Sequence, residues 1–169
     1  MSAPSSSTLS KPGLLVVDDN PILRGLLGDF FTLCGAPVWQ ASDGRQALSL
    51  MEAQQNRIDM LLLDVVMPRM GGRELLRELR KQNSKVPCCI MTGYVEEHTE
   101  QELLDLGATR VFWKPFRSLP TLAEEVFELA SESTRFSYTL EESIRESQDG
   151  TVKNVKDLIN ARRPWIPLT

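Results

Sequence analysis

Apolar residues in this chain form short continuous runs that alternate with longer segments in which they recur every three or four positions. The runs predict strands, because four or five consecutive apolar residues suit a sheet that is buried on both faces. The spaced segments predict helices with one buried face. Five such strand and helix units in succession predict an α/β protein with a doubly wound parallel sheet, right-handed crossovers and helices on both faces.

The runs place five strands at residues 14–17, 38–41, 58–63, 88–91 and 109–113. The spaced segments place five helices: from Ile22 to Cys34, after Ser42-Asp43-Gly44, after Gly71-Gly72, from about Glu96 to Leu106, and from Leu122 to Leu129. Residues 1–12 are rich in Ser and Pro and are expected to be a flexible leader. Residues 13–130 are then the folded domain, and residues 131–169 a short C-terminal helical extension.

The extension has the pattern of two short amphipathic helices. Thr139-Leu140-Glu141-Glu142 has the form of a capping box before Ile144, and apolar residues from Val152 onward share one helix face. Helices this short are marginal alone and need a surface to bury against. That surface is expected on the folded domain itself, on a second copy in a homodimer, or on a partner protein.

Composition narrows the classes of partner. A chain of 169 residues with a net charge of −4 has no basic surface for nucleic acid and no polybasic patch for a membrane. It also lacks an apolar stretch long enough to span a bilayer or to act as a signal peptide. The expected location is cytoplasmic, and the expected partners are proteins, with no nucleic acid and no membrane.

Neither the cysteines nor the single histidine suggests chemistry. Cys34, Cys88 and Cys89 lie in apolar segments without metal-ligand spacing, which predicts buried reduced thiols. His98 lies at a polar helix start and is expected to be a solvated surface residue.

Candidate chemistry lies at the strand ends. Leu61 to Leu63 is an apolar run that ends in Asp64, and taken alone this carboxylate would be a helix or turn cap. In a parallel sheet, however, ligands bind beyond the carboxyl ends of the strands, where the strand order reverses. Four strand ends carry polar residues that are expected to converge there, namely Asp18, Asp19, Asp64, Thr92 and Lys114.

These residue types suit phosphoryl transfer. Three carboxylates in one corner repel each other unless a cation compensates, and hard oxygen ligands suit Mg²⁺. An ionised Asp is a competent nucleophile toward phosphorus and forms an aspartyl phosphate. Lys114 and Thr92 could neutralise charge on the phosphoryl oxygens.

Residues 13–130 resemble the receiver domain of two-component response regulators. The family pattern is an acidic pair (Asp18-Asp19), a phosphoacceptor Asp followed by Met-Pro and Gly-Gly (Asp64, Met67-Pro68, Gly71-Gly72), a Thr (Thr92) and Lys-Pro (Lys114-Pro115). The resemblance implies a flavodoxin-like sheet of order 2-1-3-4-5 with five helices. It also implies a Lys114-Pro115 bond that is held cis.

The resemblance implies a signalling function rather than an enzyme. Asp64 would accept a phosphoryl group from a histidine kinase or phosphotransfer protein. Mg²⁺ would bind Asp19, Asp64 and the Val66 carbonyl, with Asp18 acting largely through water. Thr92 and Lys114 would contact the phosphoryl group, and Val66 and Tyr94 resemble positions that tune the lifetime of the aspartyl phosphate.

One residue departs from the family pattern. Where the family usually has Tyr or Phe, three positions before Lys114, this chain has Val111. Trp113 shares that strand face by the period of two, and is expected to serve as ordinary packing. The sequence therefore supports phosphorylation of this domain more strongly than output by a two-state aromatic switch.

Three functions fit these observations. The first is a phosphorylatable regulator whose output is contact with a downstream protein target, since the extension is too short and too weakly basic for a winged-helix domain. The second is a Mg²⁺-dependent phosphatase with an aspartate nucleophile, although such enzymes place an Asp-x-Asp motif after their first strand. The third is a degenerate receiver that acts as a constitutive interaction scaffold, which Val111 alone favours.

Overall fold

The structure is a computed structural model that describes residues 11–54, 56–93 and 99–132. Its sheet has five strands, all parallel, in the order β2-β1-β3-β4-β5. The strands are β1 (Leu14–Val17), β2 (Val38–Ala41), β3 (Met60–Asp64), β4 (Cys88–Thr92) and β5 (Arg110–Trp113). Five helices alternate with them, as the sequence predicts. The fold is therefore a flavodoxin-like, doubly wound α/β fold.

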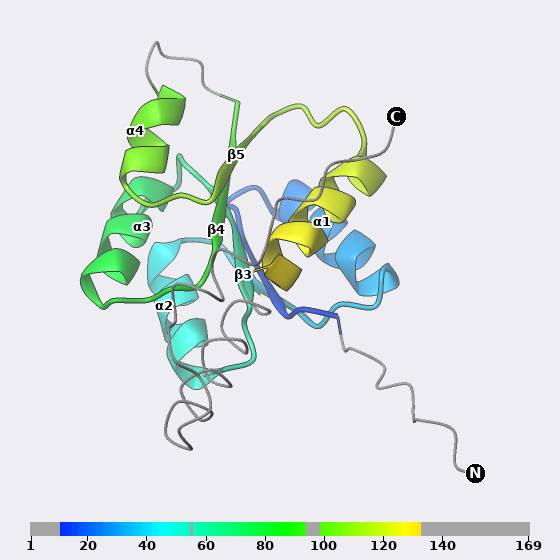
Figure 1. Ribbon diagram of the computed structural model, residues 1–169, viewed down its shortest axis with the longest axis horizontal. Helices are drawn as coiled ribbons and strands as arrows, with labels where there is room; N and C mark the ends of the chain where they lie inside the picture. The colour runs from blue at the N-terminus through cyan, green and yellow to red at the C-terminus, as the bar shows by residue number, and fades with distance from the viewer. Residues whose placement is uncertain (1–10, 55, 94–98, 133–169) are drawn as a thin grey trace, which may run out of the picture. The chain divides into compact units, whose positions relative to one another are not determined.

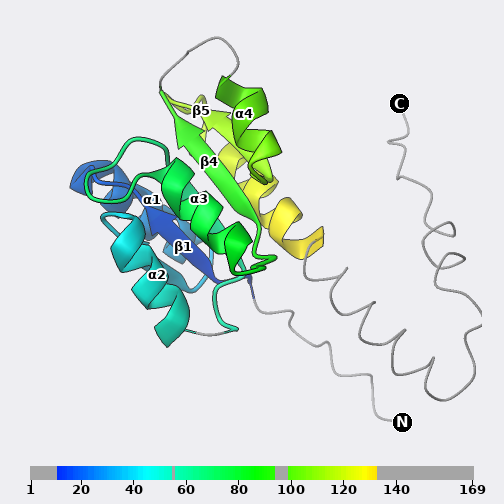
Figure 2. The ribbon, with the colours of Figure 1, turned by 90° about the vertical axis from the view of Figure 1, so that its left-hand side faces the viewer.

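The helices form two layers. They are α1 (Pro21–Leu33), α2 (Gly44–Ala53), α3 (Gly72–Lys81), α4 (Thr99–Asp105) and a C-terminal helix at residues 119–132. Figure 1 shows the sheet edge-on, with α1 and the C-terminal helix on one face and α2, α3 and α4 on the other. Figure 2 shows the second face from the front.

Alternate residues of each strand feed two separate cores. Leu15, Val17, Leu61 and Leu63 pack with the apolar faces of α2 and α3. The neighbouring residues of the same strands, which include Leu14, Val16 and Leu62, pack instead with Leu27 and Phe31 of α1 and with Val126 of the C-terminal helix. Because both faces are covered at the centre of the sheet, β1, β3 and β4 have no polar side, which is why they appear in the sequence as almost unbroken apolar runs.

Local capping explains where α1 begins and ends. Asn20 precedes the helix, and its side chain accepts hydrogen bonds from the backbone N–H groups of Ile22 and Leu23. Pro21 occupies the first helical position, where its missing N–H costs nothing. Gly35 takes a φ of 88°, a left-handed conformation that stops the helix.

Several element boundaries differ from the sequence prediction by one to three residues. β3 covers Met60–Asp64 rather than residues 58–63, because its pairing with β1 begins where Leu14 faces Met60. The N–H groups of Asp59 and Met60 both donate to the Gly13 carbonyl, at 2.8 and 3.2 Å, which marks the start of the strand. α4 covers Thr99–Asp105 within the described residues, and the expected start near Glu96 lies outside them.

Several sequence predictions also lie outside the described residues. These are the leader, the helical extension, His98 and Tyr94. Among the cysteines, Cys88 and Cys89 are buried and free, whereas Cys34 is only partly buried, contrary to expectation, because it lies at the exposed end of α1. Burial raises the pKa of Cys89 to about 12, so that thiol stays protonated.

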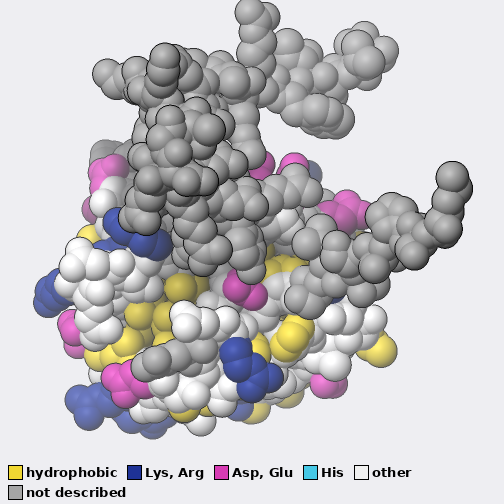
Figure 3. Space-filling model, turned by 60° about the horizontal axis from the view of Figure 1, so that its bottom comes forward, with side chains coloured by type: hydrophobic (Ala, Val, Ile, Leu, Met, Phe, Trp, Pro, Cys, Tyr) yellow, Lys and Arg dark blue, Asp and Glu magenta, His cyan; other side chains and the backbone are white. Residues whose placement is uncertain are grey.

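Charge and apolar surface are mixed on the face of the molecule drawn in Figure 3. Among the described residues on that face, Lys and Arg side chains lie apart from one another, with Asp and Glu between them. This part of the surface therefore presents no field of a single sign. None of the described helices is long and apolar enough to cross a membrane.

Candidate functional site

Three carboxylates meet at the carboxyl end of the sheet. Asp18 and Asp19 follow β1, and Asp64 ends the adjacent strand β3. One oxygen from each carboxylate lies within 4.8 Å of the others. Asp18 is 1% exposed and Asp64 9%, whereas Asp19 is open to solvent. The structure thus brings together three of the residues that the sequence placed at one edge.

Lys114 connects two of these carboxylates. Its Nζ donates to Asp18 Oδ2 and to Asp64 Oδ1, both at 2.7 Å. The Lys114 side chain is 20% exposed, so this cation is also largely withdrawn from water. The ammonium lies between two carboxylates, and hydrogen bonds between charged groups are stronger than those between neutral groups.

The segment after β1 holds Asp18 in place. Its Oδ1 accepts a hydrogen bond from the Asn20 backbone N–H at 2.9 Å, and its carbonyl accepts one from Arg24 Nη1 at 2.6 Å. Asp18 therefore faces Lys114 with only one oxygen. The roles of Asn20 and Arg24 were not predicted, because a cap next to an acidic pair looks in sequence like one continuous polar corner.

Asp64 is positioned by the helix that follows it. A Cβ on Gly72 would lie 2.2 Å from the Asp64 carbonyl oxygen, so the first turn of α3 can approach the end of β3 only because that residue is glycine. The Gly72 N–H also donates to the Val65 carbonyl at 2.9 Å. This close approach explains the second glycine of the Gly-Gly pair that the sequence shows after Asp64.

Thr92 and Lys114 complete the edge of the site. Thr92 ends β4, is 1% exposed, and lies one residue beyond Met91, the register partner of Asp64. The Lys114 backbone N–H donates to the Thr92 carbonyl at 2.7 Å. The Lys114-Pro115 peptide bond is cis, as the resemblance implies.

The pKa values of Asp64 and of Lys114 are both raised, for different reasons. Loss of solvent raises the pKa of Asp64, and the Asp18 and Asp19 charges add to this, while Lys114 opposes it. Desolvation would lower the pKa of Lys114, but its hydrogen bonds to Asp18 and Asp64 outweigh that effect, so its pKa is raised. Lys114 is therefore charged at neutral pH.

The donor set fits a divalent cation. Three carboxylates and one ammonium leave a charge of −2 on the ionised site. The candidate ligands are oxygen atoms, which suits Mg²⁺, a cation that binds through one or two carboxylates and keeps several waters. The acidic triad is typical of the magnesium site of receiver domains.

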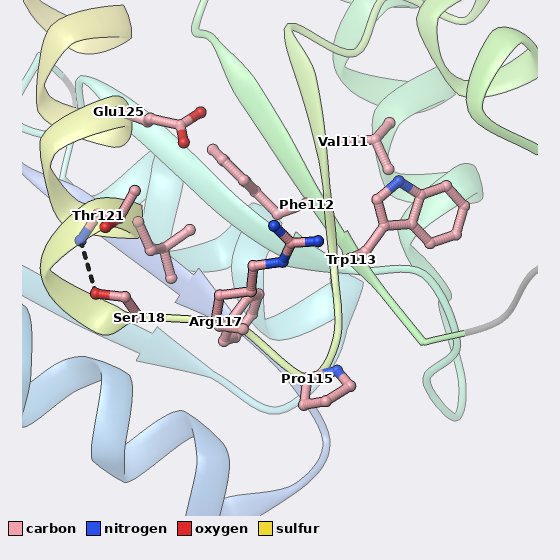
Figure 4. A pocket seen from close by; sticks show the side chains of 10 residues that line it. Val111, Phe112, Trp113, Pro115, Arg117, Ser118, Thr121 and Glu125 are labelled. Carbon is pink, nitrogen blue, oxygen red and sulfur yellow. Dashed lines mark hydrogen bonds between the residues drawn. The ribbon is translucent and has the colours of Figure 1, made fainter.

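Figure 4 shows the strand that carries the departure from the family pattern. Val111 and Trp113 project from one side of β5 and Phe112 from the other, as the period of two predicts. Val111 is buried, at 8% exposed. Trp113 is 39% exposed, so its indole is packed only in part, because β5 is an edge strand.

One contact near the site had no signature in the sequence. Arg69, five residues after Asp64, donates to Asp43 Oδ2 through both Nε and Nη2. Asp43 was expected only as a cap for α2. The contact joins residues 26 positions apart, and nothing in the local pattern at either end indicates it.

The parallel sheet of this order, with an acidic pocket and a lysine at its carboxyl edge, is the arrangement expected of a receiver domain. Residues 14–126 match the response regulator receiver domain, and the chain belongs to that family. Receiver domains are generally signalling switches rather than enzymes, and the Asp18, Asp19 and Asp64 pocket is consistent with a phosphoacceptor site.

Individual relatives agree with the family assignment. Sporulation initiation phosphotransferase F of Bacillus subtilis is 38% identical over 103 residues, which cover 61% of this chain and 82% of the relative. Sensor protein EvgS of Escherichia coli is 38% identical over 105 residues, 62% of this chain but only 9% of that protein. The receiver domain of the Francisella response regulator 1452 superposes with a TM-score of 0.67 at 31% identity, covering 72% of this chain and 98% of that domain.

Proposed function

We propose that this protein is a response regulator that accepts a phosphoryl group on Asp64 from a histidine kinase or phosphotransfer protein, with Mg²⁺ as cofactor. The observation that carries the proposal is the placement of Asp64. This carboxylate ends a buried strand, lies 2.7 Å from the Lys114 ammonium and shares its pocket with Asp18 and Asp19.

In the proposed reaction, an oxygen of Asp64 attacks phosphorus in line as the bond from phosphorus to the donor's leaving group breaks. Lys114 would neutralise charge on the phosphoryl oxygens, and the Thr92 hydroxyl would donate to one of them. Asp19, Asp64 and the Val66 carbonyl would hold Mg²⁺, with Asp18 acting through water. The bound cation supplies the positive charge that the ionised pocket lacks.

The surface beside the pocket supports a protein as phosphodonor. Ile22 and Leu26 of α1 are 81% and 51% exposed, and Val66 is 67% exposed. A groove of about 500 Å³ runs alongside, lined by Leu23, Leu26, Lys114, Pro115, Phe116 and Leu119. Exposed apolar side chains grouped at a polar site are typical of an interface, so a donor protein would bury them as it delivers its phosphoryl group.

For the output, we propose contact with a downstream protein target in the cytoplasm. The extension at residues 131–169 supplies amphipathic segments for such a contact, or for a homodimer. Deleting the chain after Ala130 and measuring the mass in solution tests this directly. A change in oligomeric state or in binding to a partner is expected, and no change in either would contradict a role for the extension.

A phosphorylation experiment separates this proposal from its alternatives. Acetyl phosphate with Mg²⁺ is expected to add one phosphoryl group to the protein, and the Asp64→Asn variant is expected to take up none. Undiminished labelling of that variant would overturn the assignment of Asp64. Turnover of unrelated phosphate esters would instead favour a phosphatase. A chain that no donor labels would favour the constitutive scaffold, the reading that the buried Val111 supports.

A further inference from the structure

The loop between β3 and α3 carries the Val66 carbonyl, and its partly buried Val65, Met67 and Met70 side chains pack against the core. Within the loop, the Met70 N–H donates to the Pro68 carbonyl at 2.7 Å. Apart from the hydrogen bonds that join the loop to α3, such as that from the Gly72 N–H to the Val65 carbonyl, two connections among the described residues tie the loop to a more distant element. In one, the Gly44 N–H donates to the Met70 carbonyl at 2.9 Å, and in the other the Arg69 guanidinium donates to the Asp43 carboxylate. Both connections lead to the start of α2.

Asp43 divides its carboxylate between two tasks. Oδ1 accepts hydrogen bonds from the N–H groups of Arg45 and Gln46, at 2.8 and 3.0 Å, and so caps α2. Oδ2 accepts from Arg69 Nε at 2.8 Å and also from Nη2. The Asp43 side chain is only 6% exposed, so the contact with Arg69 is shielded from water and salt on the side of the carboxylate.

The backbone at Arg69 indicates that its side chain matters. Arg69 has a φ of 65°, in the left-handed region that glycine adopts readily and other residues rarely do. A turn that needed only this backbone shape would be easier with glycine. Arginine is in the less favourable conformation here, and its guanidinium is the part that reaches Asp43.

The chain between Arg69 and Val66 is short and stiff. Pro68 fixes its own φ, and its ring restricts the backbone of Met67 before it. Fewer backbone rotations are therefore free between Arg69 and the Val66 carbonyl, so the position of Arg69 restricts that of the carbonyl. On the other side of the contact, a Cβ on Gly44 would lie 2.5 Å from Met70 Cγ, so the start of α2 and the loop already approach as closely as they can.

We propose that Asp43 and Arg69 act as a positioning pair, which anchors the β3–α3 loop to the start of α2 and thereby holds the Val66 carbonyl where it can bind Mg²⁺. The inference rests on the proposed function, because it takes the Val66 carbonyl as a metal ligand. Neither residue of the pair touches the metal or the phosphoryl group. Their effect is on Mg²⁺ affinity, through the orientation of one ligand.

Titration calorimetry with Mg²⁺ on the full chain tests the pair. Arg69→Gly removes the side chain while keeping a residue that tolerates the left-handed backbone. Outer partners of metal ligands commonly contribute about 10-fold or more to affinity. Because one ligand of several is affected here, we expect the Mg²⁺ dissociation constant of Arg69→Gly to rise about 3-fold to 10-fold. Arg69→Lys, which retains a cation, is expected to recover part of the loss.

Two further variants distinguish positioning from general stability. Asp43→Asn keeps an oxygen to cap α2 but places an amide against Arg69, so it should weaken Mg²⁺ binding as Arg69→Gly does, and the double variant should be no weaker than either. Arg110→Ala breaks the exposed Arg110 to Glu125 ion pair and serves as the matched control. At saturating Mg²⁺, the phosphorylation rate of Arg69→Gly should return to near that of the wild type.

The outcomes are separable from those for the proposed function. If Arg69→Gly binds Mg²⁺ within twofold of the wild type, or if the wild type binds none, the positioning pair is overturned. A lower melting temperature with unchanged Mg²⁺ affinity would show a purely structural contact and would overturn it as well. Failure of the wild type to accept a phosphoryl group, with Mg²⁺ binding intact and dependent on Arg69, would count against the proposed function alone.

Discussion

Replacing Lys114 by methionine removes a cation that contacts both buried carboxylates of the site. Lys114 lies 2.7 Å from both Asp18 and Asp64, whose side chains are 1% and 12% exposed. Methionine keeps most of the length and apolar stem of lysine, so packing changes little. The substitution therefore leaves two neighbouring carboxylates without their counter-charge.

The expected loss of stability follows from these distances. At an effective dielectric constant of about 20, each ammonium–carboxylate pair at this separation attracts by roughly 6 kcal/mol. The cost of withdrawing the three charges from water cancels much of that sum, and removing one partner of a buried pair usually costs about 3 to 5 kcal/mol. Because Lys114 is 20% exposed, we expect the low end, about 3 kcal/mol, or roughly 10 °C in melting temperature.

Thermal unfolding of the metal-free protein at neutral pH measures this loss. Added Mg²⁺ should narrow the gap between variant and wild type, because the more negative pocket of Lys114→Met binds the cation more tightly. Acid should narrow it too, since protonated carboxylates need no counter-charge. Melts without metal at neutral pH, with Mg²⁺ and in acid together show whether Lys114→Met lowers stability through lost charge or through altered packing.

Arg110→Met is the matched control, because Arg110 forms an ion pair with Glu125 at 2.8 Å but both side chains are well exposed, at 50% and 38%. Surface pairs of this kind contribute less than about 1 kcal/mol. If Lys114→Met unfolds at the same temperature as this control, or if Mg²⁺ fails to stabilise it more than the wild type, the description of the site as an undercompensated acidic pocket is wrong.

Three further predictions concern stability. Without Mg²⁺, Asp64→Asn should melt at a higher temperature than the wild type at neutral pH, because the raised pKa of Asp64 means that its ionised form opposes folding. In melts across pH, this gain in melting temperature should disappear as the pH falls through the raised pKa to the ordinary value of 3.8. Asp43→Ala should lower the free energy of unfolding by about 1 to 2 kcal/mol at neutral pH, because it removes the cap of α2. Backbone hydrogen bonds, such as that from Gln46, lower the pKa of Asp43, so in acid titrations this loss should shrink as the pH falls below the ordinary pKa of that carboxyl. In urea, Gly72→Ala should cost about 2 kcal/mol or more, because its Cβ would meet the Asp64 carbonyl; Gly25→Ala, with nothing within 4 Å, should gain about 0.5 to 1 kcal/mol.

The sequence was sufficient for the sheet and for the convergence of the polar residues. Asp18, Asp64 and Lys114 are far apart in the chain, yet parallel strands bring their carboxyl ends to one edge whatever the loops do. The unbroken apolar runs identified the central strands, because burial on both faces leaves no polar alternation. The convergence of these three residues at one edge of the sheet therefore follows from the topology, which the pattern of strands and helices determines.

Details that depend on loop geometry or on the sheet boundary were not predictable in this way. The contact between Asp43 and Arg69 requires a left-handed backbone at Arg69, which the pattern of apolar residues does not encode. The period of two placed Trp113 on the same face as Val111 but said nothing about its exposure. That depends on β5 being the last strand of the sheet, which leaves the indole partly uncovered.

The central claim is that Asp64 carries the phosphoryl group, and chemical trapping tests it most directly. Borohydride reduces an aspartyl phosphate to homoserine, which mass spectrometry of peptides locates in the sequence. After treatment with acetyl phosphate and Mg²⁺, homoserine is expected at position 64, and its yield should fall when the cation is chelated. Homoserine at Asp18 or Asp19 instead, or none at any position in a protein that carries phosphate, would contradict the account.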